Sequence, residues 1–254
     1  MLDFKDHFSN HSTAYGEYRP EYPNELFKYL ASLSPTQETA WDSATGTGQA
    51  ALGLTHFFDR VIASDASKNQ INNAIRHPAI EYRVTPSEKT DIEPQSIDLI
   101  VVAQALHWFN LEAFFDECRR VLKDRGVIAV WSYGLHRISP DIDPIIQHLY
   151  EGVIGSYWPP ERKMVKEGYR DIELPFQGIE TPGFNMRASW SLPRLIGYLG
   201  TWSAVQKYKE SRDSDPIQLI SDELSSAWGD PQQQRMIEWP MTLKVSVKTV
   251  TDSS

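Results

Sequence analysis

A turn with two glycines follows an acidic residue in the first third of the chain. Residues 42–48 read DSATGTG, which places Asp42 before Gly46 and Gly48. Glycines at such a turn let the backbone approach a bound nucleoside closely. Two glycines alone occur as often in an ordinary turn between a strand and a helix as in a nucleoside-binding turn. The motif therefore needs a second feature before it indicates a ligand.

A second acidic residue ends the next predicted strand. Asp65 lies 23 residues after Asp42 and closes the run 60–65 (RVIASD). A carboxylate at such a strand end can accept hydrogen bonds from both hydroxyls of a ribose. An acid in this place is often merely solvated, but together with the turn it predicts a nucleoside site.

The charge of Asp42 distinguishes two kinds of nucleoside ligand. Gly46, Gly48 and Ala51 also fit the loose dinucleotide pattern, so a nicotinamide-dependent oxidoreductase is one alternative. A carboxylate facing a pyrophosphate would gain nothing, because both are anions. S-adenosylmethionine carries a sulfonium and an ammonium group and no phosphate, so Asp42 favours this cationic ligand.

Several secondary-structure elements must bring these residues together. Short apolar or alternating runs predict five strands, at 39–44, 60–65, 80–85, 97–103 and 127–131. Helices are predicted at 49–54, at 68–75 after the N-cap Ser67, and at 111–123 after the N-cap Asn110. Each connection is long enough to cross over, which predicts right-handed βαβ units and a parallel sheet.

The second half of the chain does not continue the alternation of strands and helices. Residues 134–238 mix helical segments with proline-containing turns, and residues 241–250 alternate as a late strand. The expected fold class is α/β, with a Rossmann-like, doubly wound, mostly parallel seven-stranded sheet, an antiparallel last strand and a mainly helical elaboration. We expect a single domain over 1–254, divided into a cofactor-binding core (1–133), a substrate-side elaboration (134–238) and a terminal strand (239–254).

Composition and charge limit the partners. The chain has 25 Lys and Arg against 34 Asp and Glu, a net charge of −9, which disfavours nucleic acid. Cys118 is the single cysteine, and the histidines lack metal-ligand spacing, so no metal is expected. The apolar stretch 99–109 is too short for a membrane span, which needs about twenty residues. With a polar N-terminus, we expect a cytoplasmic protein, a monomer or weak homodimer, without a membrane partner.

Seven segments resemble class I S-adenosylmethionine-dependent methyltransferases, in particular the small-molecule branch that includes the trans-aconitate methyltransferases. The resemblance covers most of the chain and is strongest over 15–133. The matching segments are 15–23 (YGEYRPEYP), 41–51 (WDSATGTGQAA), 61–65, 85–88 (TPSE), 102–110 (VAQALHWFN), 126–131 and 201–204 (TWSA).

The resemblance implies a role for individual residues of the cofactor site. Asp42 and the glycine turn would hold the methionine end, Asp65 the ribose, and Gln104 would face the sulfonium. Ala44 stands where the family pattern usually has its first glycine. The implied cofactor contacts are Tyr15, Arg19, Asp42, Ala44, Gly46, Gly48, Asp65, Ala66, Ser87, Glu88 and Gln104, with Ser87 and Glu88 beside the adenine and with Tyr15, Tyr18 and Arg19 as an N-terminal cover.

The substrate end is expected to combine aromatic rings with one histidine. Ring faces attract a sulfonium and its methyl group, and the candidate substrate residues are Trp108, Trp131, Tyr133 and Trp202. His107 is the candidate base for a hydroxyl or carbon acid, although it could simply pack beside Trp108. A carboxylate nucleophile would need no base.

These residues predict an S-adenosylmethionine-dependent methyltransferase that acts on a small organic molecule, with a carboxylate as one candidate. The nicotinamide-dependent oxidoreductase is one alternative on the same architecture. A protein that binds S-adenosylmethionine without turnover is the other, and Ala44 is the sequence feature that favours it.

Overall fold

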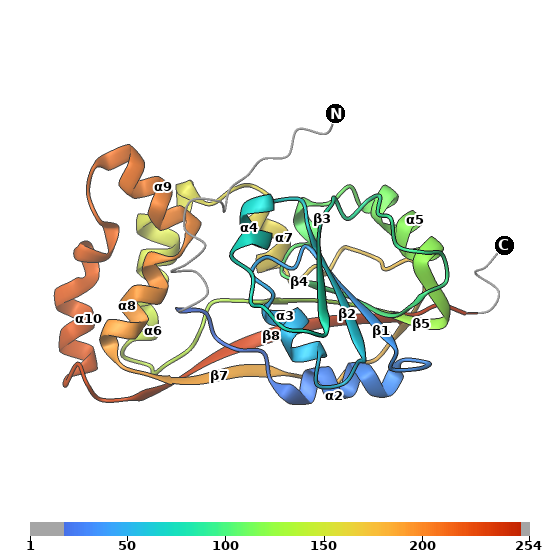
Figure 1. Ribbon diagram of the computed structural model, residues 1–254. Helices are drawn as coiled ribbons and strands as arrows, with labels where there is room; N and C mark the ends of the chain where they lie inside the picture. The colour runs from blue at the N-terminus through green and yellow to red at the C-terminus, as the bar shows by residue number, and fades with distance from the viewer. Residues whose placement is uncertain (1–17, 250–254) are drawn as a thin grey trace.

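The computed structural model describes residues 18–249, so the expectation for Tyr15 lies outside the described residues. These residues form one twisted sheet with helices on both faces and a helical group beyond one end of it (Figure 1). The strands are β1 (Thr39–Ser43), β2 (Arg60–Asp65), β3 (Ile80–Val84), β4 (Ile97–Ala103), β5 (Leu122–Tyr133), β6 (Gln177–Ile179), β7 (Asn185–Trp190) and β8 (Arg235–Val247).

The strand order is β3-β2-β1-β4-β5-β8-β6, and β7 pairs with the other half of β8. The first five strands are parallel to their neighbours, whereas β8 is antiparallel to β5, β6 and β7. The expected mostly parallel sheet with an antiparallel late strand is confirmed. Strand order reverses between β1 and β4, which is where an open α/β sheet places its ligand.

Helices cover both faces of the sheet because successive residues of its buried strands point to opposite sides. Leu99 of β4 packs with Leu26 of α2 (Asn24–Leu33) and Leu54 of α3 (Gln49–Leu54). Its neighbour Ile100 packs on the other face with Phe114 of α5 (Leu111–Val121). This two-sided burial explains the near-continuous apolar sequence of β4.

Local sequence signals set several helix boundaries. The Ser67 side chain accepts a hydrogen bond from the Gln70 N–H at the start of α4 (Lys68–Asn72), and Asn110 does the same for the Ala113 N–H at the start of α5. Both predicted N-caps are confirmed. The helix predicted over 111–123 stops at Val121, because buried Lys248 donates to the carbonyl oxygens of Arg119 and Leu122 and β5 begins there.

The elaboration is attached to the sheet through β8, which is longer than predicted. This strand starts at Arg235 rather than 241; its residues 241–247 pair with β5 and its residues 235–240 pair with β7. In Figure 1, β7 and β8 run together from the sheet to the group that contains α6, α8, α9 and α10. The helices of the elaboration are α6 (Asp143–Gln147), α7 (Arg162–Lys166), α8 (Leu192–Gly200), α9 (Ser203–Arg212) and α10 (Ser221–Trp228).

Candidate cofactor and substrate site

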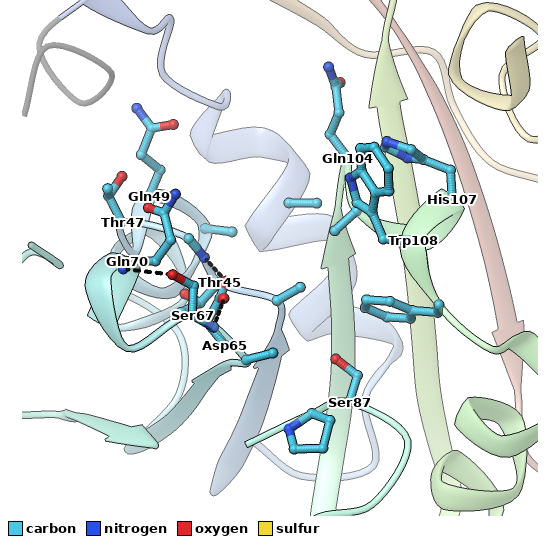
Figure 2. Close-up of a pocket in the computed structure, with 18 of the residues that line it drawn as sticks. Thr45, Thr47, Gln49, Asp65, Ser67, Gln70, Ser87, Gln104, His107 and Trp108 are labelled. Atoms are coloured by element: carbon cyan, nitrogen blue, oxygen red, sulfur yellow. Dashed lines mark hydrogen bonds between the residues drawn. The ribbon is translucent and has the colours of Figure 1, made fainter. Parts of the chain in front are cut away.

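A cavity of about 720 Å³ opens at the carboxyl ends of β1, β2 and β4. Figure 2 shows Thr45, Asp65 and Ser67 on one side of this cavity, with Gln104 and His107 across from them. The wall is formed by Ala44–Thr47, Gln49, Ala50, Asp65–Ser67, Gln70, Pro86–Glu88, Ala103–Ala105, His107–Asn110, Tyr22, Tyr133 and Glu161. The cavity therefore lies where the reversal of strand order predicts a ligand.

The turn after β1 is built from left-handed residues. Ala44, Gly46 and Gly48 have φ angles of 56°, 57° and 88°. A Cβ atom at Gly48 would lie 2.3 Å from the hydroxyl oxygen of Tyr82, whereas one at Gly46 would meet no atom within 4 Å. Gly48 is thus required by a close approach as well as by its backbone conformation. Ala44 adopts the left-handed conformation in spite of its methyl group, so the turn keeps the shape that glycine would give it.

Asp65 joins two loops at the edge of the cavity. One of its carboxylate oxygens accepts a hydrogen bond of 2.9 Å from the Gly46 N–H, and the other accepts one of 2.8 Å from the Ser67 N–H. A carboxylate oxygen has two lone pairs and can accept more than one hydrogen bond. Asp65 is therefore placed to fix the turn and bind a ligand at once.

Asp42 lies behind the cavity wall rather than on it. Its Oδ2 accepts hydrogen bonds from the Thr45 hydroxyl at 2.5 Å and the Ala51 N–H at 2.9 Å. Its Oδ1 is buried and has no hydrogen-bond partner within the described part of the chain. Burial raises the pKa of Asp42 to about 7, the nearby Asp65 charge adds to this rise, and the two hydrogen bonds oppose it. Asp42 therefore holds the turn from behind the wall, and its contact with a cationic ligand through the buried Oδ1 stays a prediction.

Gln104 follows β4 and places its side-chain amide at the cavity from a strained backbone conformation. Gln104 has a φ of 57°, its N–H donates to the Trp131 carbonyl, and its Oε1 accepts from the Tyr133 N–H at 2.8 Å. The amide NH₂ of Gln104 can donate to a ligand, and Oε1 has a second lone pair that can still accept a hydrogen bond. A strained non-glycine residue at a cavity is a feature that often accompanies function.

Ser87 and Glu88 also lie on the cavity wall, and their place beside the adenine stays a prediction. The Ser43 hydroxyl donates to the Ser87 hydroxyl oxygen at 2.7 Å, which links the loop after β3 to β1. Glu88 Oε1 accepts a 3.0 Å hydrogen bond from the Asn110 N–H. This part of the wall joins the loops after β3 and β4 beside Ala66 and Asp65.

His107 lines the cavity in a neutral form. Its Nδ1 lies 3.0 Å from the Tyr169 hydroxyl, and its ring centroid lies 4.6 Å from that of Trp108. Burial, and to a smaller extent the positive charge of Arg162, lowers the pKa of His107 to about 3. A side chain that holds a proton so weakly is a poor general base for a hydroxyl.

Some predicted residues lie away from the cavity. Trp131 is fully buried between the sheet and α2, with its ring 5.4 Å from that of Tyr22. Trp202 packs in the elaboration core, with its ring 5.6 Å from that of Tyr150. Both expectations of substrate contact are corrected, because these large rings fill the hydrophobic cores.

The N-terminal cover is only partly described. Arg19 does not line the cavity; it donates a 3.0 Å hydrogen bond to the hydroxyl of Tyr133, which does line it. The Arg19 guanidinium also lies 5.5 Å from the centre of the Tyr198 ring. Arg19 therefore lies behind the cavity wall and contacts it through Tyr133.

The structure adds wall residues that the sequence did not single out. Thr45 and Thr47 lie within the glycine turn, and Gln70 lies on the first turn of α4, so their positions in the motifs could have indicated them. Tyr22 comes from the segment before α2, and Glu161 precedes α7 in the elaboration. Tyr169, which contacts His107, carries no sequence signal, because it is 62 residues distant in the chain.

Residues 18–249 contain neither a cluster of metal-ligating side chains nor a membrane-spanning helix. No group of three or more His, Cys, Asp or Glu side chains is arranged to hold a metal ion there. No helix within the same range has both the length and the apolar character needed to cross a bilayer.

Comparisons with known proteins agree with this fold and cavity. The "Methyltransferase domain" family matches residues 41–130. A protein of Dictyostelium discoideum that is named as a methyltransferase is 35% identical over 229 residues, covering 89% of this chain and 87% of its own. CRG1 of Saccharomyces cerevisiae, named as an S-adenosylmethionine-dependent methyltransferase, is 31% identical over 248 residues, covering 81% of this chain and 83% of its own.

A solved structure extends the similarity to the tertiary level. A protein from Anaeromyxobacter dehalogenans, described as a type II methyltransferase, superposes with a TM-score of 0.86 at 41% identity and covers 90% of this chain and 97% of its own. The sheet and the cavity at its switch point are those of a Rossmann-like enzyme. By sequence and by structure, the chain belongs to the S-adenosylmethionine-dependent methyltransferases.

Proposed function

We propose that this methyltransferase binds S-adenosylmethionine in the cavity and transfers the methyl group to a carboxylate of a small organic molecule. Three features of the site suit the cofactor: Asp65 for the ribose hydroxyls, the buried and unpartnered Oδ1 of Asp42 behind the turn, and the amide of Gln104. When bound, this cofactor supplies a methyl group already activated by a sulfonium, so the protein has mainly to position and desolvate the reactants.

The burial of His107, together with the contact of its Nδ1 with the Tyr169 hydroxyl, carries the choice of a carboxylate. A phenol or alcohol must lose a proton as it attacks, and His107, with a pKa of about 3, is poorly suited to take it. A carboxylate is already ionised at neutral pH, so its oxygen can attack the methyl carbon while the C–S electron pair leaves with sulfur. No proton moves in this step.

Local charge at the substrate end also favours an anion, in spite of the net charge of −9. The Arg162 guanidinium lies 4.6 Å from the centre of the Trp158 ring, and its Nε donates to the Tyr150 hydroxyl at 3.4 Å. Its charge contributes to lowering the pKa of His107 and opposes the rise in the pKa of Tyr169, which supports a place for it near this end of the site. A carboxylate there would gain from this positive charge.

The finer placement within the family follows from the same reasoning. An acid substrate agrees with the small-molecule branch that includes the trans-aconitate methyltransferases, which segments 15–23 and 102–110 resemble. The alternative of a binder without turnover loses its main support, because Ala44 keeps the left-handed conformation of the turn.

The test is a substrate screen. The purified chain is incubated with S-adenosylmethionine and with matched sets of small carboxylic acids, phenols and amines, and S-adenosylhomocysteine release is measured together with the mass of the product. We expect methyl esters, identified by their hydrolysis in alkali, from the acids alone. Turnover of phenols or amines without turnover of any acid would contradict the proposal.

Glu161 provides a second test, because it is an acidic side chain of the wall on the elaboration side. If the substrate enters as a carboxylate, no base is required, and Glu161→Gln should retain activity or increase it by removing a like charge. A Glu161→Gln variant that folds and binds the cofactor but shows no turnover would assign Glu161 as a base and contradict the carboxylate reading.

A further inference from the structure

Tyr169 reaches the site from the elaboration, just after α7. It is 1% exposed, and its hydroxyl lies 3.0 Å from Nδ1 of His107. The two rings are nearly parallel, with 27° between their planes and 6.2 Å between their centroids. His107 is part of the cavity wall and Tyr169 is not, so Tyr169 contacts His107 from the side away from the cavity.

The direction of this hydrogen bond follows from the surroundings of the hydroxyl. Burial raises the pKa of Tyr169 well above its usual value, so the hydroxyl keeps its proton, and backbone N–H groups of Leu106 and His107 act on its oxygen. Within residues 18–249, Nδ1 of His107 lies within hydrogen-bond distance of that hydroxyl and can accept its proton. A buried hydroxyl proton without an acceptor costs about 1–3 kcal/mol, so the tyrosine donates to Nδ1. A neutral imidazole with an acceptor Nδ1 carries its hydrogen on Nε2.

The backbone around Tyr169 is strained and held in place by β8. Gly168 and Tyr169 have φ angles of 62° and 56°, two left-handed residues in succession. A Cβ at Gly168 would lie 2.7 Å from the Thr242 hydroxyl oxygen. The Lys244 ammonium group donates to the carbonyl oxygens of Tyr169 at 2.7 Å and of two further residues of the turn. Such strain persists where the surrounding structure fixes it, and here it aims the hydroxyl at His107.

We propose that Tyr169 is a positioning residue that holds His107 in the tautomer with hydrogen on Nε2, so that His107 donates a hydrogen bond to the substrate instead of accepting a proton. Nδ1 is occupied on the side away from the cavity, which leaves Nε2 to a ligand. The identity of the acceptor, one oxygen of a carboxylate, rests on the proposed function; the tautomer and the role of Tyr169 do not.

The consequence for the reaction is orientation. A carboxylate has two oxygens, and a donor that binds one of them leaves the other to attack the methyl carbon in line. A general base would need a free lone pair on Nε2, and the Tyr169 hydroxyl removes that possibility by fixing the hydrogen there. The specificity is therefore for a substrate with a hydrogen-bond acceptor beside its nucleophilic atom.

The first experiment reads the tautomer directly. The protein is labelled with ¹⁵N in its seven histidines, and the His107 signals are assigned by their loss in His107→Gln. In the wild type, without substrate, we expect the long-range ¹H–¹⁵N pattern of an imidazole protonated on Nε2, and in Tyr169→Phe a mixture of both tautomers. A wild-type pattern of Nδ1–H, or an unchanged pattern in a folded Tyr169→Phe, would overturn the proposal. Because no turnover is needed, this result is independent of the proposed function.

The second experiment is a double-mutant cycle on kcat. Tyr169→Phe should lower kcat about tenfold, a loss on the order of one hydrogen bond, with cofactor affinity unchanged. In a His107→Ala background the same change should have no further effect, because the residue through which Tyr169 acts is gone. His107→Gln, which keeps an N–H donor, should retain more activity than His107→Ala. Tyr157→Phe, which removes a surface hydroxyl bound to Arg212, is the control and should behave as the wild type.

The cycle separates positioning from general support of the fold. An equal loss from Tyr169→Phe in both backgrounds would mean that Tyr169 acts through packing alone and would overturn its assigned role. Equal activity of His107→Gln and His107→Ala would overturn the donor role of His107.

Discussion

The Asp65 carboxylate accepts a 2.9 Å hydrogen bond from the Gly46 N–H, so the end of β2 and the turn after β1 form one unit. The acid that would bind the ribose is thus also the acid that shapes the glycine turn. Loss of the Asp65 charge should weaken cofactor binding in two ways, by removing the contact with the ribose and by loosening the glycine turn.

Asp65→Ala should weaken S-adenosylmethionine binding by roughly 2–3 kcal/mol, or about 30- to 140-fold, because charge-assisted hydrogen bonds are lost. Calorimetric titration measures this change. Asp116→Asn, which breaks an exposed pair with Arg119, is the matched control. Equal binding by wild type and Asp65→Ala would refute the ribose assignment.

The two glycines of the turn should differ in their tolerance of alanine. Gly46→Ala faces open space and carries only the penalty of a left-handed conformation, about 1–2 kcal/mol. Gly48→Ala adds a collision with the Tyr82 hydroxyl and should cost at least about 3 kcal/mol. Thermal unfolding should show the difference, at about 2–4 °C per kcal/mol for a chain of this size. Introducing Tyr82→Phe should rescue part of the Gly48→Ala loss and none of the Gly46→Ala loss; equal Tm values for the two alanine variants would be inconsistent with this geometry.

Cofactor binding should release a proton near pH 7. Burial raises the pKa of Asp42 to about 7 in the ligand-free protein, so about half of the molecules carry a proton there at that pH. A cationic ligand nearby favours the carboxylate and lowers this pKa. Affinity should therefore rise as the pH increases through 7, and the binding enthalpy should depend on the ionisation enthalpy of the buffer. Asp42→Asn should abolish both effects; the same buffer dependence in the variant would argue against Asp42 as the source of the proton.

His136 should make the protein sensitive to acid. Its ring lies among Tyr198, Trp202 and Trp239, both ring nitrogens lack a partner in the described structure, and burial lowers its pKa to about 3. Below its ordinary pKa of about 6.5 the unfolded chain binds a proton that the folded chain does not, so stability is lost as the pH falls from about 6.5 towards 3. At pH 5 this loss is about 2 kcal/mol.

His136→Phe should remove that loss, since phenylalanine does not titrate and suits an aromatic pocket. Urea unfolding at pH 7.5 and pH 5 measures it: the advantage of the variant over the wild type should be about 2 kcal/mol larger at pH 5. The contributions of Asp42 and His107 occur in both proteins and cancel in this comparison. An advantage that does not change with pH would show that His136 is protonated in the folded state.

Features that depend on neighbours in the sequence could be read without the structure. The strand at 60–65 and that at 97–103 have the predicted bounds, and Ser67 and Asn110 cap the predicted helices. A buried strand needs an unbroken apolar run, and a cap needs one polar side chain a few residues before a backbone N–H. Asp65 belongs to the same class, because its place follows from the strand that it ends.

Only the tertiary structure could decide contacts between distant segments. Tyr169 contacts His107 because β8 holds the strained turn that precedes it. Asp42 lies behind the cavity wall because its carboxylate accepts hydrogen bonds from Thr45 and Ala51. Trp131 and Trp202 are buried in the hydrophobic cores. An aromatic ring has the same pattern in a sequence whether it fills a core or faces a ligand. The difference is set by which other side chains reach the same volume, and that depends on how the whole chain packs.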